Sequence, residues 1–337
     1  MKTGRINGNV WKRSIERQLH TKRKEVLSGM SAAEACTVLR TGPDEMTVSA
    51  GAFASGRTRQ TGEYAIVRAV NDLAAKGAQP VAIVLKVLLP EGTSEQKLKD
   101  IIGSMEGMCK RLNVQITGAE CEVTPAVNQI IVCADAIGKV PEEKILPMGE
   151  VRAGQEIILC GSIGLEGMLR ILDEREDELS QRFVPVFITQ MKELKKELMP
   201  INALQTAEKF GITSVCQIDS GGIFAALWNL AEDKEIGLET ELGAMTILQE
   251  TVEVCEYYQL NPYQMTSAGC FLMTTKDGAG LVKALRGSGA RASRLGVATD
   301  GNARVITSKD EIRYLDRPAP DELLMWQKEQ EIRQTHK

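Results

Sequence analysis

The sequence has little of what membrane spans and nucleic-acid surfaces need. Aromatic residues make up 4% of the 337 residues, so a surface for stacking bases is not expected. No apolar run approaches the roughly 20 residues of a membrane span, and the first twenty residues lack the apolar core of a secretory signal. The net charge of −4 provides no general attraction to nucleic acid or membrane. We therefore expect a cytoplasmic protein with no nucleic-acid or membrane partner.

Histidine is almost absent, and the cysteines form no recognisable motif. Two histidines and eight scattered cysteines, with no C-x-x-C pair, argue against a structural zinc site. In a reducing compartment most of these thiols are expected to be small buried hydrophobic side chains. Cys121 and Cys216 lie beside positions discussed below, but neither segment has a histidine to activate a thiol nucleophile, so inert buried cysteine is favoured there too.

What is present fits two α/β domains, because 337 residues are enough for two separate cores. In the first half, apolar patterning predicts strands over 45–51, 80–90, 114–123 and 129–140 and a helix over 62–76. A second helix is expected to begin at Thr93, which forms a capping box with Gln96. Residues 10–27 predict a basic amphipathic helix whose charged face is solvated; binding of an anionic partner is the less favoured alternative.

The second half repeats the alternation of strands and helices. After the strand and glycine-rich turn of 152–164 come a charged helical stretch (165–210) and alternating elements up to residue 307. The turn itself is favoured as structural over a phosphate cradle, because such glycines are common between strand and helix. We predict an α/β (α+β) fold with domains at 1–150 and 151–317 and a polar helical tail at 318–337.

One polar pair interrupts an otherwise apolar helix. Asn71 and Asp72 stand among small and aliphatic residues. Arg68 and Lys76 lie four residues from Asp72 on either side, so a charge ladder along one helix face would account for the carboxylate. The alternative is that Asp72 binds a ligand.

The wider pattern favours the ligand. The runs "VNDLAAKGAQP", "NVQITGAECEVTPAV", "IGLEG", "DSGGIFAALWNLAE" and "NPYQMTSAGCFLM" resemble the aminoimidazole-ribonucleotide (AIR) synthase superfamily, and within it the hydrogenase maturation factor branch. The resemblance covers residues 10–316. It implies an N-terminal domain whose strands pair across a dimer as a sheet or barrel, a C-terminal α/β domain, and ATP bound with divalent metal near the dimer interface. Relatives use ATP to phosphorylate an amide, carbamoyl or similar oxygen.

Several family positions have lost their carboxylates. Where relatives have G-E-D the chain has Ala33, Glu34 and Ala35, and where they have Thr-Asp it has Ala50 and Gly51. Gln217 and Ser220 replace an aspartate and a glutamate of the second domain. The positions that match the family's nucleotide site are Asn71, Asp72, Gly118, Gly221, Gly222 and Ser267. One aspartate among alanine and amide neighbours is too few ligands for two Mg²⁺ ions.

Two interpretations follow. The first is a non-catalytic or regulatory partner subunit with an eroded ATP–Mg²⁺ site, in a homodimer or in a heterodimer with an intact paralogue. The second is an active ATP-dependent enzyme that phosphorylates or dehydrates an amide or carbamoyl substrate through a re-registered metal site made of Asp72, Glu120, Glu122 and Asp219. Small-molecule binding without catalysis is a third, weaker reading. Maturation dehydratases carry a C-terminal cysteine that accepts the carbamoyl group; here the last cysteine is Cys270, so that reaction is not expected.

Overall fold

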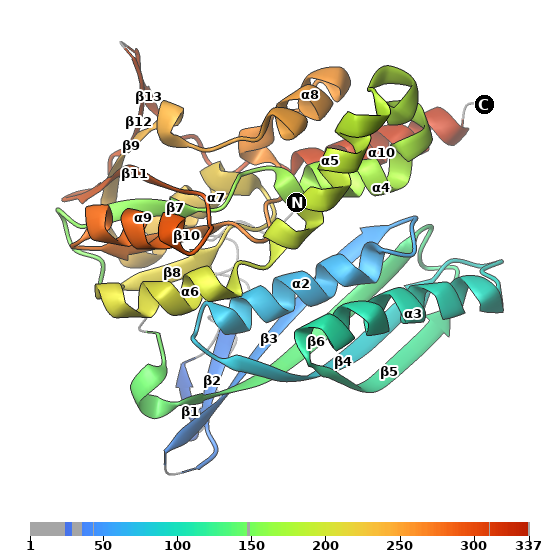
Figure 1. The fold of residues 1–337 in the computed structure, drawn as a ribbon, viewed down its shortest axis with the longest axis horizontal. Helices are drawn as coiled ribbons and strands as arrows, with labels where there is room; N and C mark the ends of the chain where they lie inside the picture. The colour runs from blue at the N-terminus through green and yellow to red at the C-terminus, as the bar shows by residue number, and fades with distance from the viewer. Residues whose placement is uncertain (1–23, 29–35, 43, 147–148, 310, 336–337) are drawn as a thin grey trace.

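A computed structural model describes residues 24–28, 36–42, 44–146, 149–309 and 311–335. It contains two β-sheets, one from each half of the chain, with helices packed on both (Figure 1). The predicted two-domain α/β fold is confirmed. The exact domain boundaries at 150 and 317 stay predictions. No helix in these ranges is long and apolar enough to cross a membrane.

The first sheet has six strands in the order β1-β2-β3-β6-β4-β5. Only β4 and β5 pair in parallel; the other pairs are antiparallel. The strands are β1 (Val26–Ser28), β2 (Cys36–Arg40), β3 (Glu45–Gly56), β4 (Gln79–Leu89), β5 (Gln115–Val123) and β6 (Ile130–Pro141). Helices α2 (Thr61–Ala74) and α3 (Glu95–Leu112) cover one face of this sheet, and among the described residues the other face carries no helix (Figure 1).

The start of α3 differs from the prediction by one residue. Ser94 is the N-cap, and its hydroxyl accepts a hydrogen bond from the Lys97 amide at 3.2 Å. Thr93 instead donates its hydroxyl to the Pro90 carbonyl at 2.7 Å and so closes the turn before the helix. Serine and threonine are both favourable N-cap residues, and Ser94 is the cap here because the Thr93 hydroxyl is already bonded in the preceding turn.

The second sheet has seven strands in the order β13-β12-β9-β11-β7-β10-β8. They are β7 (Glu156–Cys160), β8 (Ser214–Gln217), β9 (Gly237–Glu241), β10 (Phe271–Thr275), β11 (Ala292–Thr299), β12 (Arg304–Ser308) and β13 (Glu311–Tyr314). The α-helices of this half are α4 (Leu165–Arg182), α5 (Pro185–Glu193), α6 (Ile201–Ala207), α7 (Gly222–Lys234), α8 (Gln249–Tyr258), α9 (Gly278–Gly287) and α10 (Glu322–Thr335). Short 3₁₀ turns lie at Glu142–Lys144, Leu194–Leu198, Glu208–Phe210, Leu242–Ala244 and Pro262–Gln264.

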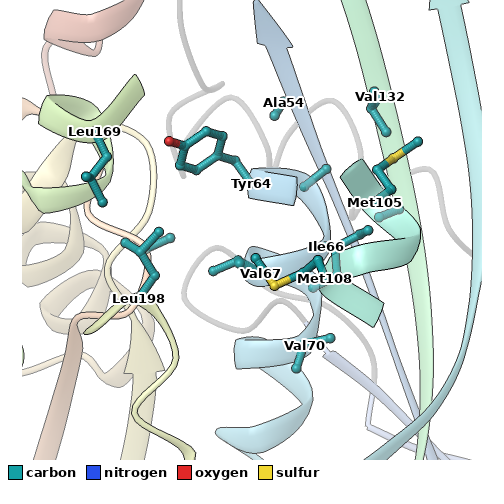
Figure 2. Packing of buried hydrophobic residues seen from close by; sticks show 14 of the residues in the cluster. Ala54, Tyr64, Ile66, Val67, Val70, Met105, Met108, Val132, Leu169 and Leu198 are labelled. Atoms are coloured by element: carbon teal, nitrogen blue, oxygen red, sulfur yellow. The ribbon is translucent and has the colours of Figure 1, made fainter. Parts of the chain in front are cut away.

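The largest buried cluster joins the two halves. It contains side chains of β3, β4, β6, α2 and α3 together with side chains of α4, α8 and α10. Figure 2 shows Tyr64 of α2 directed toward Leu169 of α4, with Leu198 close below. Both faces of α2 are therefore covered, which explains why 13 of its 14 residues are buried.

Three segments differ from the sequence-based expectations. The predicted helix over 10–27 lies outside the described residues up to 23, and its last two residues belong to strand β1. Strands β2 and β13 were not expected. β2 is only five residues long, and every residue of β13 is exposed, so neither gives a strong apolar pattern.

Candidate functional site

The candidate site lies where the second half of α2 meets strand β8 and the segment before β10. Asn71 is fully buried, and its amide nitrogen donates to the Leu198 carbonyl at 2.7 Å and to the Gln217 side-chain oxygen at 3.0 Å. Its own Oδ1 is buried without a hydrogen bond among the described residues. Asn71 therefore ties the N-terminal half to the C-terminal half.

Gln217, at the end of β8, connects the polar groups of α2. Its amide nitrogen donates to Asp72 Oδ1 at 2.8 Å and to the Arg68 carbonyl at 3.0 Å. Its oxygen accepts from Asn71 and, at 3.3 Å, from the Gly269 amide. An amide thus faces Asp72, and it supplies donors that a carboxylate at this position could not supply.

Arg68 is the buried cation of the site, with 7% of its surface exposed. Its guanidinium pairs with Asp219, donates to Thr266 Oγ1 at 3.1 Å and to the Phe53 carbonyl at 2.8 Å. Arg68 Nε lies 3.7 Å from a carboxylate oxygen of Glu166. The pKa of Arg68 is lowered by burial, an effect that the negative charge of Glu166 opposes.

Glu166, on the first turn of α4, is completely buried between two arginines. Its oxygens accept from Thr266 at 2.7 Å, from the Ala268 amide at 3.0 Å and from Arg170 at 3.2 Å. Burial acts to raise the pKa of Glu166, but the charges of Arg68 and Arg170 and these hydrogen bonds outweigh it, and the net pKa is lowered. The carboxylate is therefore held ionised in the core.

The glycines of the site shape a tight turn before α7. Gly221 and Gly222 have φ of 86° and 65°, and a Cβ at Gly222 would lie 2.5 Å from the Tyr263 carbonyl oxygen. The Gly221 amide donates to the carboxylate of Asp321 at 2.6 Å. Ser267 accepts from the Gly164 amide at 2.7 Å, which fixes the turn between β7 and α4. Both turns bring backbone amides to this region.

The remaining predicted residues lie elsewhere. Gly118, Glu120 and Glu122 are on the edge strand β5, and both glutamates are exposed. Across the described ranges, no group of three or more His, Cys, Asp or Glu side chains is arranged to hold a metal ion. The four-carboxylate metal site stays a prediction. Asp72 contacts Gln217 and Asp219 contacts Arg68, whereas the two glutamates lie on β5.

The expectation of buried cysteine at Cys121 and Cys216 needs correction. Cys121 is exposed and not buried, because the end of β5 is an uncovered edge of the sheet. Cys216 is half-buried. Partial burial raises the pKa of the Cys121 thiol, so its neutral form is favoured and a ready nucleophile is not.

Sequence reasoning missed the roles of Arg68, Glu166 and Asp321. Arg68 was assigned to a ladder with Asp72, but its ion pairs with Glu166 and Asp219 join residues far apart in the sequence; Arg68 and Asp219 are 151 positions apart. The sequence offers one indication of a buried charge: Glu166, within the "IGLEG" run, follows directly after a segment that predicts a buried strand.

The fold and this polar junction define a class of protein, and comparison with known families agrees. Residues 34–140 match the domain described as "AIR synthase related protein, N-terminal domain", and residues 152–309 match "AIR synthase related protein, C-terminal domain". The chain belongs to the AIR synthase related family, and its relatives include hydrogenase maturation proteins.

Two curated relatives and one solved structure illustrate the likeness. The chain is 28% identical to the "Putative hydrogenase expression/formation protein MJ0676" of Methanocaldococcus jannaschii over 73% of its length and 72% of that protein. It is 26% identical to "Carbamoyl dehydratase HypE" of Rhodobacter capsulatus, over 72% and 69% of the two chains. The structure "Hydrogenase Maturation Protein HypE in complex with ATP" superposes with a TM-score of 0.62 at 18% identity, covering 94% of this chain and 96% of that one.

Proposed function

We propose that this protein is a hydrogenase-maturation-factor-like member of the family whose ATP–Mg²⁺ site is eroded, and that it works in the cytoplasm as a non-catalytic or regulatory partner subunit. In this proposal the inherited nucleotide site includes Asn71, Asp72, Gly221, Gly222 and Ser267, which lie on or beside α2, β8, α7 and the segment before β10. In this proposal they serve mainly to hold the two halves of the chain together.

The observation that carries the proposal is the pairing of Arg68 with Asp219. A guanidinium in contact with a carboxylate already supplies the positive charge that a divalent ion would bring, and it would repel such an ion. Gln217 meanwhile donates its amide to Asp72. Because Mg²⁺ needs several free, hard oxygen ligands in an octahedral arrangement, the residues present do not fit it.

The open face of the first sheet supports an assembly with a second subunit. Phe53 on β3 is 62% exposed and Ile137 on β6 is 39% exposed, around the ion pair of Lys86 and Asp135. A partly apolar sheet face that no described helix covers favours burial against another such face. The second subunit is another copy of this chain or an intact paralogue.

Titration with ATP and Mg²⁺ tests the proposal through phosphate release and thermal stability. We expect no phosphate release above background from the wild type, while an intact hydrogenase maturation relative in the same assay releases phosphate. Binding of ATP without release agrees with the proposal. Asp72→Asn is the diagnostic variant, and Asp100→Asn, an exposed aspartate on α3, is its matched control.

Phosphate release by the wild type that Asp72→Asn abolishes and Asp100→Asn retains would contradict the proposal. That result would favour the second candidate, an ATP-dependent enzyme acting on an amide or carbamoyl group. The observation in its favour is the likeness to the carbamoyl dehydratase of Rhodobacter capsulatus. The exposure of Glu120 and Glu122 leaves them accessible for a metal site completed by a second subunit.

A further inference from the structure

Strand β13 forms an open edge of the second sheet. It is the terminal strand in the order β13-β12-β9-β11-β7-β10-β8, so among the described strands only β12 pairs with it. It lies at the outer margin of the molecule (Figure 1). An uncovered edge presents backbone N–H and C=O groups that can pair with a further strand.

Two large, mainly apolar side chains of this edge strand are in contact with water. Ile312 is 71% exposed and Tyr314 is 72% exposed. Because side chains alternate along a strand, these two share one face of the sheet, and Glu311 and Arg313 share the other. Pairing with another strand would remove part of the apolar surface from water.

The hydrogen bonds of the β12–β13 hairpin determine which backbone groups of β13 point outward. The Leu315 amide, just after β13, donates to the Arg304 carbonyl of β12 at 2.8 Å. The backbone groups of successive residues point to opposite sides of a strand, so the odd-numbered residues of β13 bond to β12. The amide and carbonyl groups of Ile312 and Tyr314 therefore point to the open edge.

Two copies of β13 match in one register. Strands related by a two-fold axis pair antiparallel. With the axis at Ile312, the outward backbone groups of Ile312 meet those of the partner's Ile312, and Glu311 faces Arg313 of the partner subunit. An axis at Glu311 or at Arg313 places like charges directly opposite each other, which is destabilising. An axis at Tyr314 brings in Leu315, which is buried.

The charges of β13 have the wrong pattern for simple protection of an edge. Charges keep edges apart best when they have one sign, because two copies then repel each other. Here Glu311 and Arg313 have opposite signs and already form an exposed ion pair within the strand. Pairing with a second copy exchanges each of these ion pairs for one between the strands, so no charge is left unmatched.

We propose that β13 pairs with β13 of a second copy of this chain about a two-fold axis at Ile312, which joins two seven-stranded sheets into one. The contact uses none of the residues of the candidate site and does not rest on the proposed function. Together with the open face around Phe53, it would link dimers into a larger assembly.

Reversal of the two charges tests the register, in the full-length chain with Phe53→Asp so that the first sheet does not contribute. Sedimentation velocity at about 200 µM should show dimers, because a contact well below the standard ~1,600 Å² is weak. Glu311→Arg and Arg313→Glu should each raise the dissociation constant at least about tenfold, because like charges then meet at two positions. An equimolar mixture of the two variants should associate again, because opposite charges then face each other at both positions. Glu95→Arg, which breaks an exposed ion pair with Lys99 on α3, should associate like the parent chain.

A disulfide tests the same register in the otherwise unsubstituted chain. Residues directly opposite in a hydrogen-bonded antiparallel pair have Cα atoms about 5.5 Å apart, which is within the range of a disulfide. Ile312→Cys should therefore give a covalent dimer on mild oxidation. In Tyr314→Cys the two introduced thiols would be about 13 Å apart along the strands, so this variant should cross-link no more than the wild type. The wild type, in which Cys121 is exposed, sets the background.

No self-association of the Phe53→Asp chain, or equal association of Glu311→Arg and Glu95→Arg, would overturn the proposal. A mixture of the charge variants that stays monomeric would overturn the register and the proposal with it. The same holds if Ile312→Cys cross-links no more than Tyr314→Cys, and this measurement remains decisive if Phe53→Asp does not fold. None of these outcomes depends on phosphate release from ATP, which tests the proposed function separately.

Discussion

At the scale of single residues, the candidate site is an arrangement of compensated charge. Glu166 and Arg68 are both buried, and neither would be stable in the core without the other. Arg170 adds a second cation on the same helix as Glu166. The negative charge of Glu166 is therefore neutralised by arginines of the same chain. In a metal site, a bound cation would neutralise the carboxylates instead.

Glu166→Gln should lower the free energy of unfolding by roughly 3–5 kcal/mol at pH 7, because buried Arg170 would lose its counter-ion and buried Arg68 would keep only Asp219. The pKa of Glu166 is below its ordinary value of 4.5 in the folded protein. Its contribution is thus complete above pH 4.5 and is lost as the pH falls through the lowered folded pKa. Urea unfolding of both proteins at pH 7, 5 and 4 measures the difference, which should shrink only at the lowest pH.

The exposed pair of Arg40 and Glu142 provides the control. The pKa of Glu142 is also lowered, chiefly by its hydrogen bond to Arg40, but both side chains are solvated. Glu142→Gln should leave the urea midpoint nearly unchanged. A Glu166→Gln variant as stable as Glu142→Gln would contradict the charge-compensation argument.

At the scale of elements, α2 holds the molecule together through two sets of contacts. Its second half carries Arg68, Asn71 and Asp72, and its first half reaches α4 through Tyr64. The Tyr64 hydroxyl donates to Asp173 at 2.6 Å, and Lys195 lies 3.7 Å from the same carboxylate. Helix α2 therefore forms a large part of the interface between the two domains.

Tyr64→Phe should reduce the free energy of unfolding by about 1–3 kcal/mol, because the Asp173 carboxylate would lose a hydrogen-bond donor and yet stay buried. Urea unfolding at neutral pH measures the loss. Tyr257→Phe is the matched control: Tyr257 is 42% exposed and donates to Glu178 at 3.3 Å, so its removal should change stability by less than about 0.5 kcal/mol. Equal losses in the two variants would show that Tyr64 does not anchor α2 to α4.

The same elements show what the sequence could predict. Strand β4 and helices α2 and α3 were predicted within two residues at nearly every end, because their apolar residues recur at strand or helix spacing over ten or more positions. Strand β13 lacks that signal, since its four residues are exposed and it is held only by hydrogen bonds to β12.

The site was harder to predict because its contacts are distant in sequence. The polar pair Asn71–Asp72 could be recognised by its position in an apolar helix. The partners of Arg68 could not, because helix periodicity relates only residues three or four apart. Asp321 could not be predicted for the same reason. A carboxylate before a polar helix is expected to be solvated, and only the folded structure shows its contact with the Gly221 amide.

At the scale of the whole molecule, the two faces of the first sheet differ in how far they are covered. Helices α2 and α3 cover one face (Figure 1). Phe53 and Ile137 remain exposed on the other. Phe53 and Cys133 are register partners across β3 and β6, so Phe53 lies on the same open face as the side chains of β6. A partly apolar face of this kind would be covered in the proposed dimer.

Phe53→Asp should therefore convert the proposed homodimer to a monomer at micromolar concentration, with little loss of monomer stability, because a side chain that is 62% exposed contributes little to its own core. Sedimentation velocity measures the mass and urea unfolding the stability. Val184→Asp, 66% exposed between α4 and α5, should remain a dimer. A Phe53→Asp variant that stays dimeric would exclude this face as the homodimer contact, because a charge buried in a closed sheet-to-sheet interface is strongly destabilising. A wild type that is monomeric on its own would exclude it as well.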